Sequence, residues 1–234
     1  LERGLAAIKT SLERMLAKEK ISAEELANVL GRIHTSTSTE SLALVDIAIE
    51  AATEVEAIKQ IIFKDLDRVC QPEAILATNT SSISITRLAA VTQRPGKVIG
   101  MHFMNPVPMM QLVEVIRALQ TEDAVFDQVT EMAKRLGKVP VDVKDAPGFV
   151  ANRILLPMIN EAVFTLYEGL ASAEEIDTVM KLGMGHPMGP LALADLIGLD
   201  TCLSIMEVLH DGFSDSKYRP CPLLKQMVDA GYLG

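Results

Sequence analysis

The sequence has no tryptophan, only six phenylalanines and three tyrosines, and three cysteines among its 234 residues. Few rings are available for base stacking, and 31 acidic residues outnumber 22 basic ones, which excludes a nucleic-acid-binding protein. Cys70, Cys202 and Cys221 are widely spaced and form no CxxC pair. This spacing argues against both a zinc site and a disulfide framework. We therefore predict no metal site and a reducing compartment, the cytoplasm.

Long apolar runs are also missing. The longest stretch without Asp, Glu, Lys or Arg is 98–113, which includes two prolines and is too short to cross a bilayer as a helix. We expect no membrane partner. Because the formal net charge is −9, an anionic ligand must be held by local lysines and backbone N–H groups.

The first half alternates predicted helices and strands. Apolar residues at helical spacing open the chain, and Ser22 with Glu25 forms a capping-box pattern for a second helix. Short runs of branched apolar residues, typical of buried parallel strands, then alternate with helical patterns. The predicted strands cover 43–50, 74–77 and 97–103, and the predicted helices cover 55–69 and 85–90. This alternation indicates a parallel sheet with helices packed on it.

The second half changes character after residue 144. A strand at 112–117, a helix at 122–136 capped by Thr121 and a strand at 139–143 come first. The turn cluster 144–148 is the clearest domain boundary. Only helical patterns follow. A long helix is predicted over 149–170, a capping box at Ser172 and Glu175 predicts the start of another, and 190–212 holds one or two more. We predict an α/β domain over 1–144 and an all-helical domain over 145–234.

His102 is the histidine with candidate partners. It stands near the end of a predicted strand, where ligands of open α/β sheets bind, and the next strand bears Glu114. If the loop between them returns the chain, Glu114 reaches the far ring nitrogen and stabilises an imidazolium. On spacing alone, a polar strand-end histidine and an unrelated surface glutamate remain the commoner case.

Three other polar segments have two interpretations each. The turn 79–82 follows a buried strand and is either a ligand-binding turn or an ordinary helix entry. Asn152 either donates to a carbonyl or is a solvated helix position. The glycine-rich segment 183–189 is similar to a dinucleotide fingerprint, but a helix precedes it and Pro187 interrupts it, so we interpret it as an interhelical loop.

Together these segments resemble the 3-hydroxyacyl-CoA dehydrogenase family, most closely its bacterial 3-hydroxybutyryl-CoA dehydrogenases. The matching stretches run in family order over nearly the whole chain and form a highly specific combination. They are IEAATE (49–54), ATNTSS (77–82), GMHFMNPVP (100–108), LVEV (112–115), DAPGFVANR (145–153) and KLGMGHPMGP (181–190).

The resemblance implies an incomplete Rossmann-like dinucleotide-binding domain followed by a helical dimerisation domain. It implies an enzyme of fatty-acid β-oxidation that oxidises an (S)-3-hydroxyacyl-CoA to a 3-oxoacyl-CoA. His102 would take the hydroxyl proton while C3 passes a hydride to the nicotinamide, and Glu114 would hold the imidazole. Ser81, Asn105 and Asn152 match positions that hold the substrate and the nicotinamide.

The resemblance also implies a cofactor, NAD with NADP as the alternative, and an acyl-CoA thioester as substrate. Glu54 and Lys59 match positions near the cofactor. Ser11 and Lys18 match a pair that contacts CoA, and residues seven apart on a helix share a face. A homodimer through the helical domain is the expected assembly.

One departure from the family stands out. The family begins with a strand, a glycine-rich turn, a helix and a second strand, whereas residue 1 already lies in a predicted helix and the sequence has no G-x-G-x-x-G. We expect the sequence to be a piece of a longer enzyme. Two other functions remain open: a crystallin-like structural relative, and a β-hydroxy acid dehydrogenase that uses a lysine base and no CoA.

Overall fold

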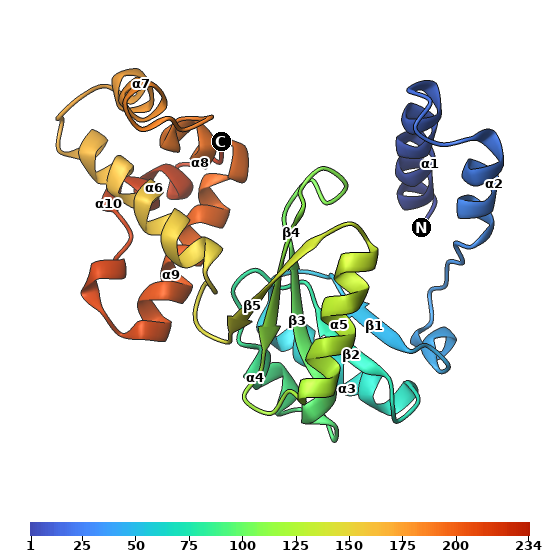
Figure 1. Ribbon diagram of the computed structural model, residues 1–234. Helices are drawn as coiled ribbons and strands as arrows, with labels where there is room; N and C mark the ends of the chain where they lie inside the picture. Colours follow the sequence, from blue (N-terminus) through green and yellow to red (C-terminus); the bar gives the residue numbers. More distant parts are fainter. The chain divides into compact units, whose positions relative to one another are not determined.

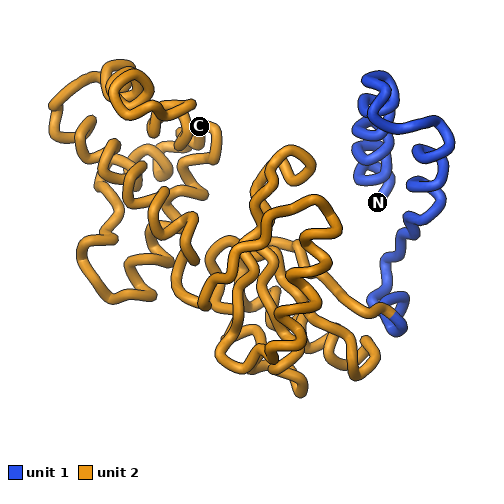
Figure 2. Tube along the Cα trace, in the orientation of Figure 1, with its two compact units in different colours: residues 1–44 blue, residues 45–234 orange.

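The structure, a computed structural model, describes residues 1–234 as two compact units, Leu1–Leu44 and Val45–Gly234 (Figure 2). The first unit is a helical hairpin of α1 (Glu2–Ala17) and α2 (Ala23–Gly31). The predicted capping box begins α2: the Glu25 N–H donates to Ser22 Oγ at 3.1 Å, and the Ser22 N–H donates to Glu25 Oε2 at 2.7 Å. These bonds satisfy two N–H groups that the first helical turn leaves free.

The second unit opens with a five-stranded sheet whose strands follow chain order (Figure 1). The strands are β1 (Ile47–Glu50), β2 (Ile75–Thr78), β3 (Val98–Phe103), β4 (Leu112–Arg117) and β5 (Val139–Lys144). β1, β2 and β3 are parallel as predicted, β3 and β4 are antiparallel, and β4 and β5 are parallel. The predicted start of the first strand at residue 43 is too early, because the 3₁₀ turn Thr39–Leu42 continues into a further turn at residues 43 and 44 before β1 begins at Ile47.

Helices cover both faces of the sheet (Figure 1). They are α3 (Glu56–Val69) and α4 (Ile85–Ala89) on one face and α5 (Asp123–Arg135) on the other. Val125 and Val129 of α5 pack on strand residues such as Ile99 and Met101. On the opposite face, a Cβ at Gly100 would lie 2.9 Å from Ile85 Cδ1, so this glycine lets α4 approach β3 closely.

Thr121 does not cap α5, so that prediction is wrong. Its buried hydroxyl donates to the Val98 carbonyl oxygen at 2.7 Å, and Glu122 is the N-cap residue instead. A hydrogen bond to a neighbouring strand thus replaced the local cap. The predicted helix end is correct, because Gly137 follows with φ of 72°.

Only helices follow β5, as predicted. They are α6 (Ala151–Tyr167), α7 (Ala173–Met184), α8 (Pro190–Ile197), α9 (Leu199–Phe213) and α10 (Pro222–Asp229). Leu156 and Ile159 of α6 are buried in a core with Met206 and Leu209 of α9. The predicted boundary after residue 144 lies within the second unit, where the last strand ends, and it stays a prediction. No helix of the structure combines the length and apolarity that crossing a membrane requires.

The glycine-rich segment 183–189 connects two helices, as the sequence analysis predicts. Gly185 ends α7 with φ of 71°, and α8 begins at Pro190. Asp177 of α7 caps α8 from outside, since its carboxylate accepts hydrogen bonds from the Leu191 N–H at 2.8 Å and the Ala192 N–H at 2.9 Å. Any side chain at Gly189 would collide with this carboxylate. The segment therefore lets the start of α8 lie against α7.

Replacing Asp177 with alanine should lower the free energy of unfolding by about 1 kcal/mol, because the first turn of α8 loses its cap. Urea unfolding followed by circular dichroism measures this difference. Thr178→Ala on the exposed face of the same helix is the matched control and should change stability by less than about 0.5 kcal/mol. Equal effects of the two substitutions would contradict the capping role.

Candidate active site

The antiparallel pairing of β3 and β4 places His102 directly opposite Glu114. The His102 Nδ1 atom lies 2.8 Å from Glu114 Oε2, and both side chains are almost fully buried. A carboxylate accepts hydrogen bonds, so Nδ1 carries the proton and Nε2 is left free to act as a base. The sequence predicted this pair only on condition that the loop returns the chain, and the loop does so.

The second carboxylate oxygen of Glu114 reaches the start of the helical part. Oε1 accepts hydrogen bonds from the Val150 and Ala151 N–H groups, each at 3.0 Å, where α6 begins. Burial raises the pKa of Glu114, but the bonds from His102 and from these two N–H groups outweigh it and hold the pKa below its ordinary value. The carboxylate is therefore charged when it faces the imidazole.

Phe149 closes the site on the helical side. Its ring is buried, and its centroid lies 5.9 Å from that of the His102 ring at an angle of 55°. An apolar wall of this kind excludes water and strengthens the interaction between the imidazole and the carboxylate. It also keeps the imidazole in one orientation.

The turn after β2 is held by Glu54. Its Oε1 atom accepts hydrogen bonds from the Thr80 hydroxyl at 2.5 Å, the Ser81 N–H at 2.8 Å, and the Ser82 N–H and hydroxyl at 3.0 and 3.1 Å. Asn152 of α6 then donates from Nδ2 to the Ser81 carbonyl oxygen at 2.9 Å. Asn152 thus donates to a carbonyl, one of its two predicted interpretations, and Ser81 and Asn152 lie side by side.

Asn79 connects this turn to the strand of His102. Its Oδ1 atom accepts a hydrogen bond from the Phe103 N–H at 2.9 Å, one residue beyond His102. The carboxyl ends of β2 and β3 are therefore tied together by a side chain of the turn. From the sequence, Asn79 is predicted only as part of the turn 79–82, with no role of its own.

Lys59 is buried among carboxylates. Its Nζ atom lies 2.9 and 2.8 Å from the two oxygens of Glu50 and 3.6 Å from Glu54 Oε2, and its side chain is 1% exposed. Sequence reasoning missed Glu50. The available signal was an acidic residue that ends an apolar strand, nine positions before a lysine in the following helix.

The remaining predicted residues are spread over exposed segments. Asn105 is exposed in the loop after β3, three residues beyond His102. Ser11 and Lys18 are exposed in the first unit, on α1 and at its C-cap. Their predicted contact with CoA stays a prediction.

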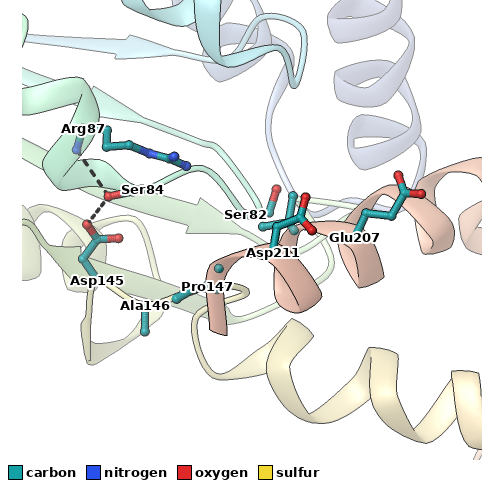
Figure 3. Close-up of a pocket in the computed structure, with 10 residues that line it drawn as sticks. Ser82, Ser84, Arg87, Asp145, Ala146, Pro147, Glu207 and Asp211 are labelled. Atoms are coloured by element: carbon teal, nitrogen blue, oxygen red, sulfur yellow. Dashed lines mark hydrogen bonds between the residues drawn. The ribbon is translucent and has the colours of Figure 1, made fainter. Parts of the chain in front are cut away.

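Asp145 is a further residue to which sequence reasoning gave no role. Its carboxylate accepts hydrogen bonds from the Ser84 hydroxyl at 2.7 Å and the Thr86 N–H at 2.8 Å, so it caps α4 from the segment that joins β5 to α6. Figure 3 shows this contact in a pocket whose other wall is α9, with Glu207 and Asp211. The bonds of Asp145 link the turn region before α4 to the segment that leads to Asn152.

Whether a dinucleotide fits depends on the groups at the carboxyl ends of β1 and β2. The Glu54 side chain is 39% exposed, and Ser81 is partly exposed beside it. Carboxylate, hydroxyl and amide groups suit ribose hydroxyls and a nicotinamide carboxamide, whereas carboxylates repel a pyrophosphate. These residues therefore fit the nicotinamide-riboside half of the cofactor.

A buried imidazole–carboxylate pair at the carboxyl end of an α/β sheet, beside a turn suited to nicotinamide, defines a dehydrogenase of the dinucleotide-binding class. Residues 1–146 match the 3-hydroxyacyl-CoA dehydrogenase NAD binding domain, and residues 148–234 match the C-terminal domain of the same enzymes. The chain belongs to the 3-hydroxyacyl-CoA dehydrogenase family, as its motifs predicted.

Relatives match over the whole chain. A 3-hydroxybutyryl-CoA dehydrogenase of Bradyrhizobium diazoefficiens is 56% identical over 100% of this chain and 80% of its own length. The mitochondrial hydroxyacyl-coenzyme A dehydrogenase of Rattus norvegicus is 39% identical over 100% of this chain and 77% of its own. The crystal structure of (S)-3-hydroxybutyryl-CoA dehydrogenase from Ralstonia eutropha superposes with a TM-score of 0.97 at 56% identity, covering 100% of this chain and 83% of that one.

The stability of the fold should depend on pH through Glu114. Because its folded-state pKa lies below the ordinary 4.5, its contribution is present above pH 4.5 and is lost as the pH falls through the lowered value. Glu114→Gln should therefore lower the unfolding free energy by about 1–3 kcal/mol at neutral pH, and by less as the pH falls below 4.5.

Urea unfolding over a series of pH values measures this difference. Glu131→Gln on the exposed face of α5 is the control, because its carboxylate pairs only with Lys134 at the surface. A difference between Glu114→Gln and the parent that stays constant down to acid pH would contradict the lowered pKa.

Proposed function

We propose that this protein oxidises (S)-3-hydroxybutyryl-CoA, and short-chain (S)-3-hydroxyacyl-CoA in general, to the 3-oxoacyl-CoA with NAD. The observation that carries the proposal is the buried His102–Glu114 pair, with Nδ1 and Oε2 2.8 Å apart. An alcohol that loses a hydride also loses a proton, and a positioned imidazole is suited to receive it. The names of the whole-chain relatives support the same substrate class.

His102 acts as general base through Nε2 in this proposal. The proton of the 3-hydroxyl passes to Nε2 as the C3 hydrogen leaves with its electron pair, and NAD supplies the hydride acceptor when bound. Glu114 keeps the other proton on Nδ1 and stabilises the imidazolium that forms. In the reverse direction, the imidazolium returns its proton to the oxygen of the 3-oxo group.

Four polar residues would place the reactants in this proposal. Ser81 and Asn152, joined by a 2.9 Å hydrogen bond, would hold the thioester substrate, and Ser81 with Asn105 would hold the nicotinamide. Glu54 would face the cofactor ribose with the exposed part of its carboxylate. These roles rest on family positions and on the geometry around the turn 79–82.

Three assignments are more distant from the dyad. Lys59 is proposed to act on the cofactor side through Glu54, since its own ammonium is buried. Ser11 and Lys18, both exposed on one helix, are proposed to contact CoA. A reducing compartment, the cytoplasm, is supported by three cysteines that are buried and unpaired.

Replacing His102 with glutamine should lower kcat by roughly 10²- to 10⁴-fold and leave the fold intact, because the amide cannot take up a proton. The enzyme is expressed from its complete coding sequence, and NADH consumption with acetoacetyl-CoA measures the rate. Circular dichroism spectra of parent and variant serve as the folding control.

Near-normal turnover of His102→Gln would remove this residue from the mechanism. Free acetoacetate is the second substrate in the same assay. Equal rates with the free acid and the thioester would favour a β-hydroxy acid dehydrogenase instead, and inactivity of the folded parent with both would favour a structural relative.

A homodimer through the helical part is also proposed. Large apolar side chains stay exposed over α6, α7, α8 and the connection between α6 and α7, which is the pattern of a surface that meets another protein. They include Tyr167, Leu170, Val179, Leu182, Met184 and Leu196. A second copy of this chain is the occupant that the family resemblance suggests.

Replacing Leu182, which is 82% exposed, with glutamate should convert the dimer to a monomer, because a charge would be buried at the interface. Light scattering after size-exclusion chromatography measures the mass. Leu119→Glu is the matched control, since Leu119 is equally exposed in the α/β part. A parent that is monomeric, or a dimer that survives Leu182→Glu, would contradict the proposed interface.

A further inference from the structure

Glu50 is a buried carboxylate that the proposed reaction does not use. It ends β1, and its side chain is 1% exposed. Both of its oxygens accept hydrogen bonds from Lys59, Oε2 accepts one from the Thr78 hydroxyl at 2.7 Å, and Oε1 accepts one from the Ala52 N–H at 2.5 Å. Every oxygen is thus engaged within the protein.

Stability alone gives a weak reason for this arrangement. Removing two charges from water costs several kcal/mol for each ion, and an apolar pair of similar size is often as stable. Burial raises the pKa of Glu50, but the hydrogen bonds from Lys59, Thr78 and Ala52 hold it below its ordinary value, so the carboxylate stays charged. The buried ion pair of Glu50 and Lys59 instead holds the Lys59 ammonium in one position.

The contacts continue from Glu50 to the proposed substrate site. Lys59 Nζ lies 3.6 Å from Glu54 Oε2, and Glu54 Oε1 holds the turn of Thr80, Ser81 and Ser82. The Ser81 carbonyl oxygen in turn accepts the hydrogen bond from Asn152. Three charged side chains therefore connect the end of β1 to the turn that carries Ser81.

We propose that Glu50 is a positioning residue for the dehydrogenase reaction: it holds Lys59, and through Lys59 it sets the place of Glu54 and of the turn 80–82. The inference rests on the proposed function, in which this turn presents Ser81. With Glu50 present, Lys59 is shared between two carboxylates. Without its charge, the ammonium is drawn towards Glu54 and competes with the donors of the turn for that carboxylate.

Glu50→Gln tests the proposal without any ligand. The Ser81 and Ser82 N–H groups donate to Glu54, so their amide hydrogens should exchange with solvent several-fold faster in the variant. Hydrogen–deuterium exchange with fragment-resolved mass spectrometry of the enzyme made from its complete coding sequence measures this. Unchanged exchange in the turn 80–82 would overturn the proposal.

Asp67→Asn is the matched control. Asp67 lies on α3, as Lys59 does, and its partly buried carboxylate pairs with Arg94 at 2.7 Å, but it stands near the C-terminal end of that helix, away from the turn. It carries the same charge change and a comparable ion-pair loss. The thermal stability of Asp67→Asn should fall as that of Glu50→Gln does. Hydrogen exchange in the turn 80–82 of Asp67→Asn should stay as in the parent.

Steady-state kinetics give the second measurement. Glu50→Gln should lower kcat/KM for NAD by roughly 10- to 100-fold, the size expected when a reactant is misplaced, and Asp67→Asn should leave it unchanged. Equal kinetic losses in both variants would show a general loss of stability and overturn the proposal. A folded parent without dehydrogenase activity would refute the proposed function instead, whatever the exchange experiment shows.

If Glu50→Gln does not fold, a double variant replaces it. Glu50→Gln with Lys59→Met removes the unpaired buried ammonium and should recover stability. Exchange in the turn 80–82 should return towards that of the parent, because no ammonium then competes with the Ser81 and Ser82 N–H groups for Glu54. Exchange in this folded double variant that stays as fast as in Glu50→Gln would also overturn the proposal.

Discussion

The carboxylate of Glu114 is the interaction on which the second unit depends. One oxygen orients His102, and the other accepts hydrogen bonds from two N–H groups at the start of α6. A helix start carries free N–H groups and a partial positive charge, so an anion there is favoured twice. The same charge therefore orders the acid–base pair and attaches the helical part to the sheet. Losing it would disturb both together.

Other side chains around this carboxylate also join segments that are distant in the sequence. Asn152 ties α6 to the turn after β2, Asp145 ties the preceding segment to α4, and Asn79 ties that turn to β3. Each bond joins segments that are distant in sequence, and each uses a side chain against a backbone group or a hydroxyl. Part of the acidic excess of the chain also lies inside the protein, where the carboxylates of Glu54, Glu114 and Asp145 accept hydrogen bonds from N–H groups.

Much of this was predictable from the sequence, for physical reasons. Strands with runs of branched apolar residues and helices with regular spacing were found within a few residues, and Ser172 with Glu175 forms its capping box. His102 and Glu114 were considered as a pair because they stand on consecutive predicted strands, but spacing alone favoured unrelated side chains, and the resemblance to the family made the dyad the prediction. Local patterns fix such features, because they depend on neighbours in the chain.

What the sequence missed depends on contacts between distant segments. The Thr121 hydroxyl donates to the Val98 carbonyl oxygen of β3 instead of capping α5, and no sequence pattern near Thr121 indicates this. Lys59 matched a position near the cofactor, and only the folded chain shows that Glu50 encloses its ammonium. The antiparallel pairing of β3 and β4 likewise depended on the direction of a loop, which spacing alone left open.

The sequence separations within the site have an entropic consequence. His102 and Glu114 are 12 residues apart, whereas Ser81 and Asn152 are 71 apart. Closing the longer loop costs about 1.5 kcal/mol more, at about 0.6 kcal/mol for each doubling of length. The hairpin that unites His102 with Glu114 therefore closes at a lower entropic cost than the contact between Ser81 and Asn152, which depends on the helices docking. In the proposed function, the residues that transfer the proton would thus be brought together locally, and those that hold the reactants would be brought together later.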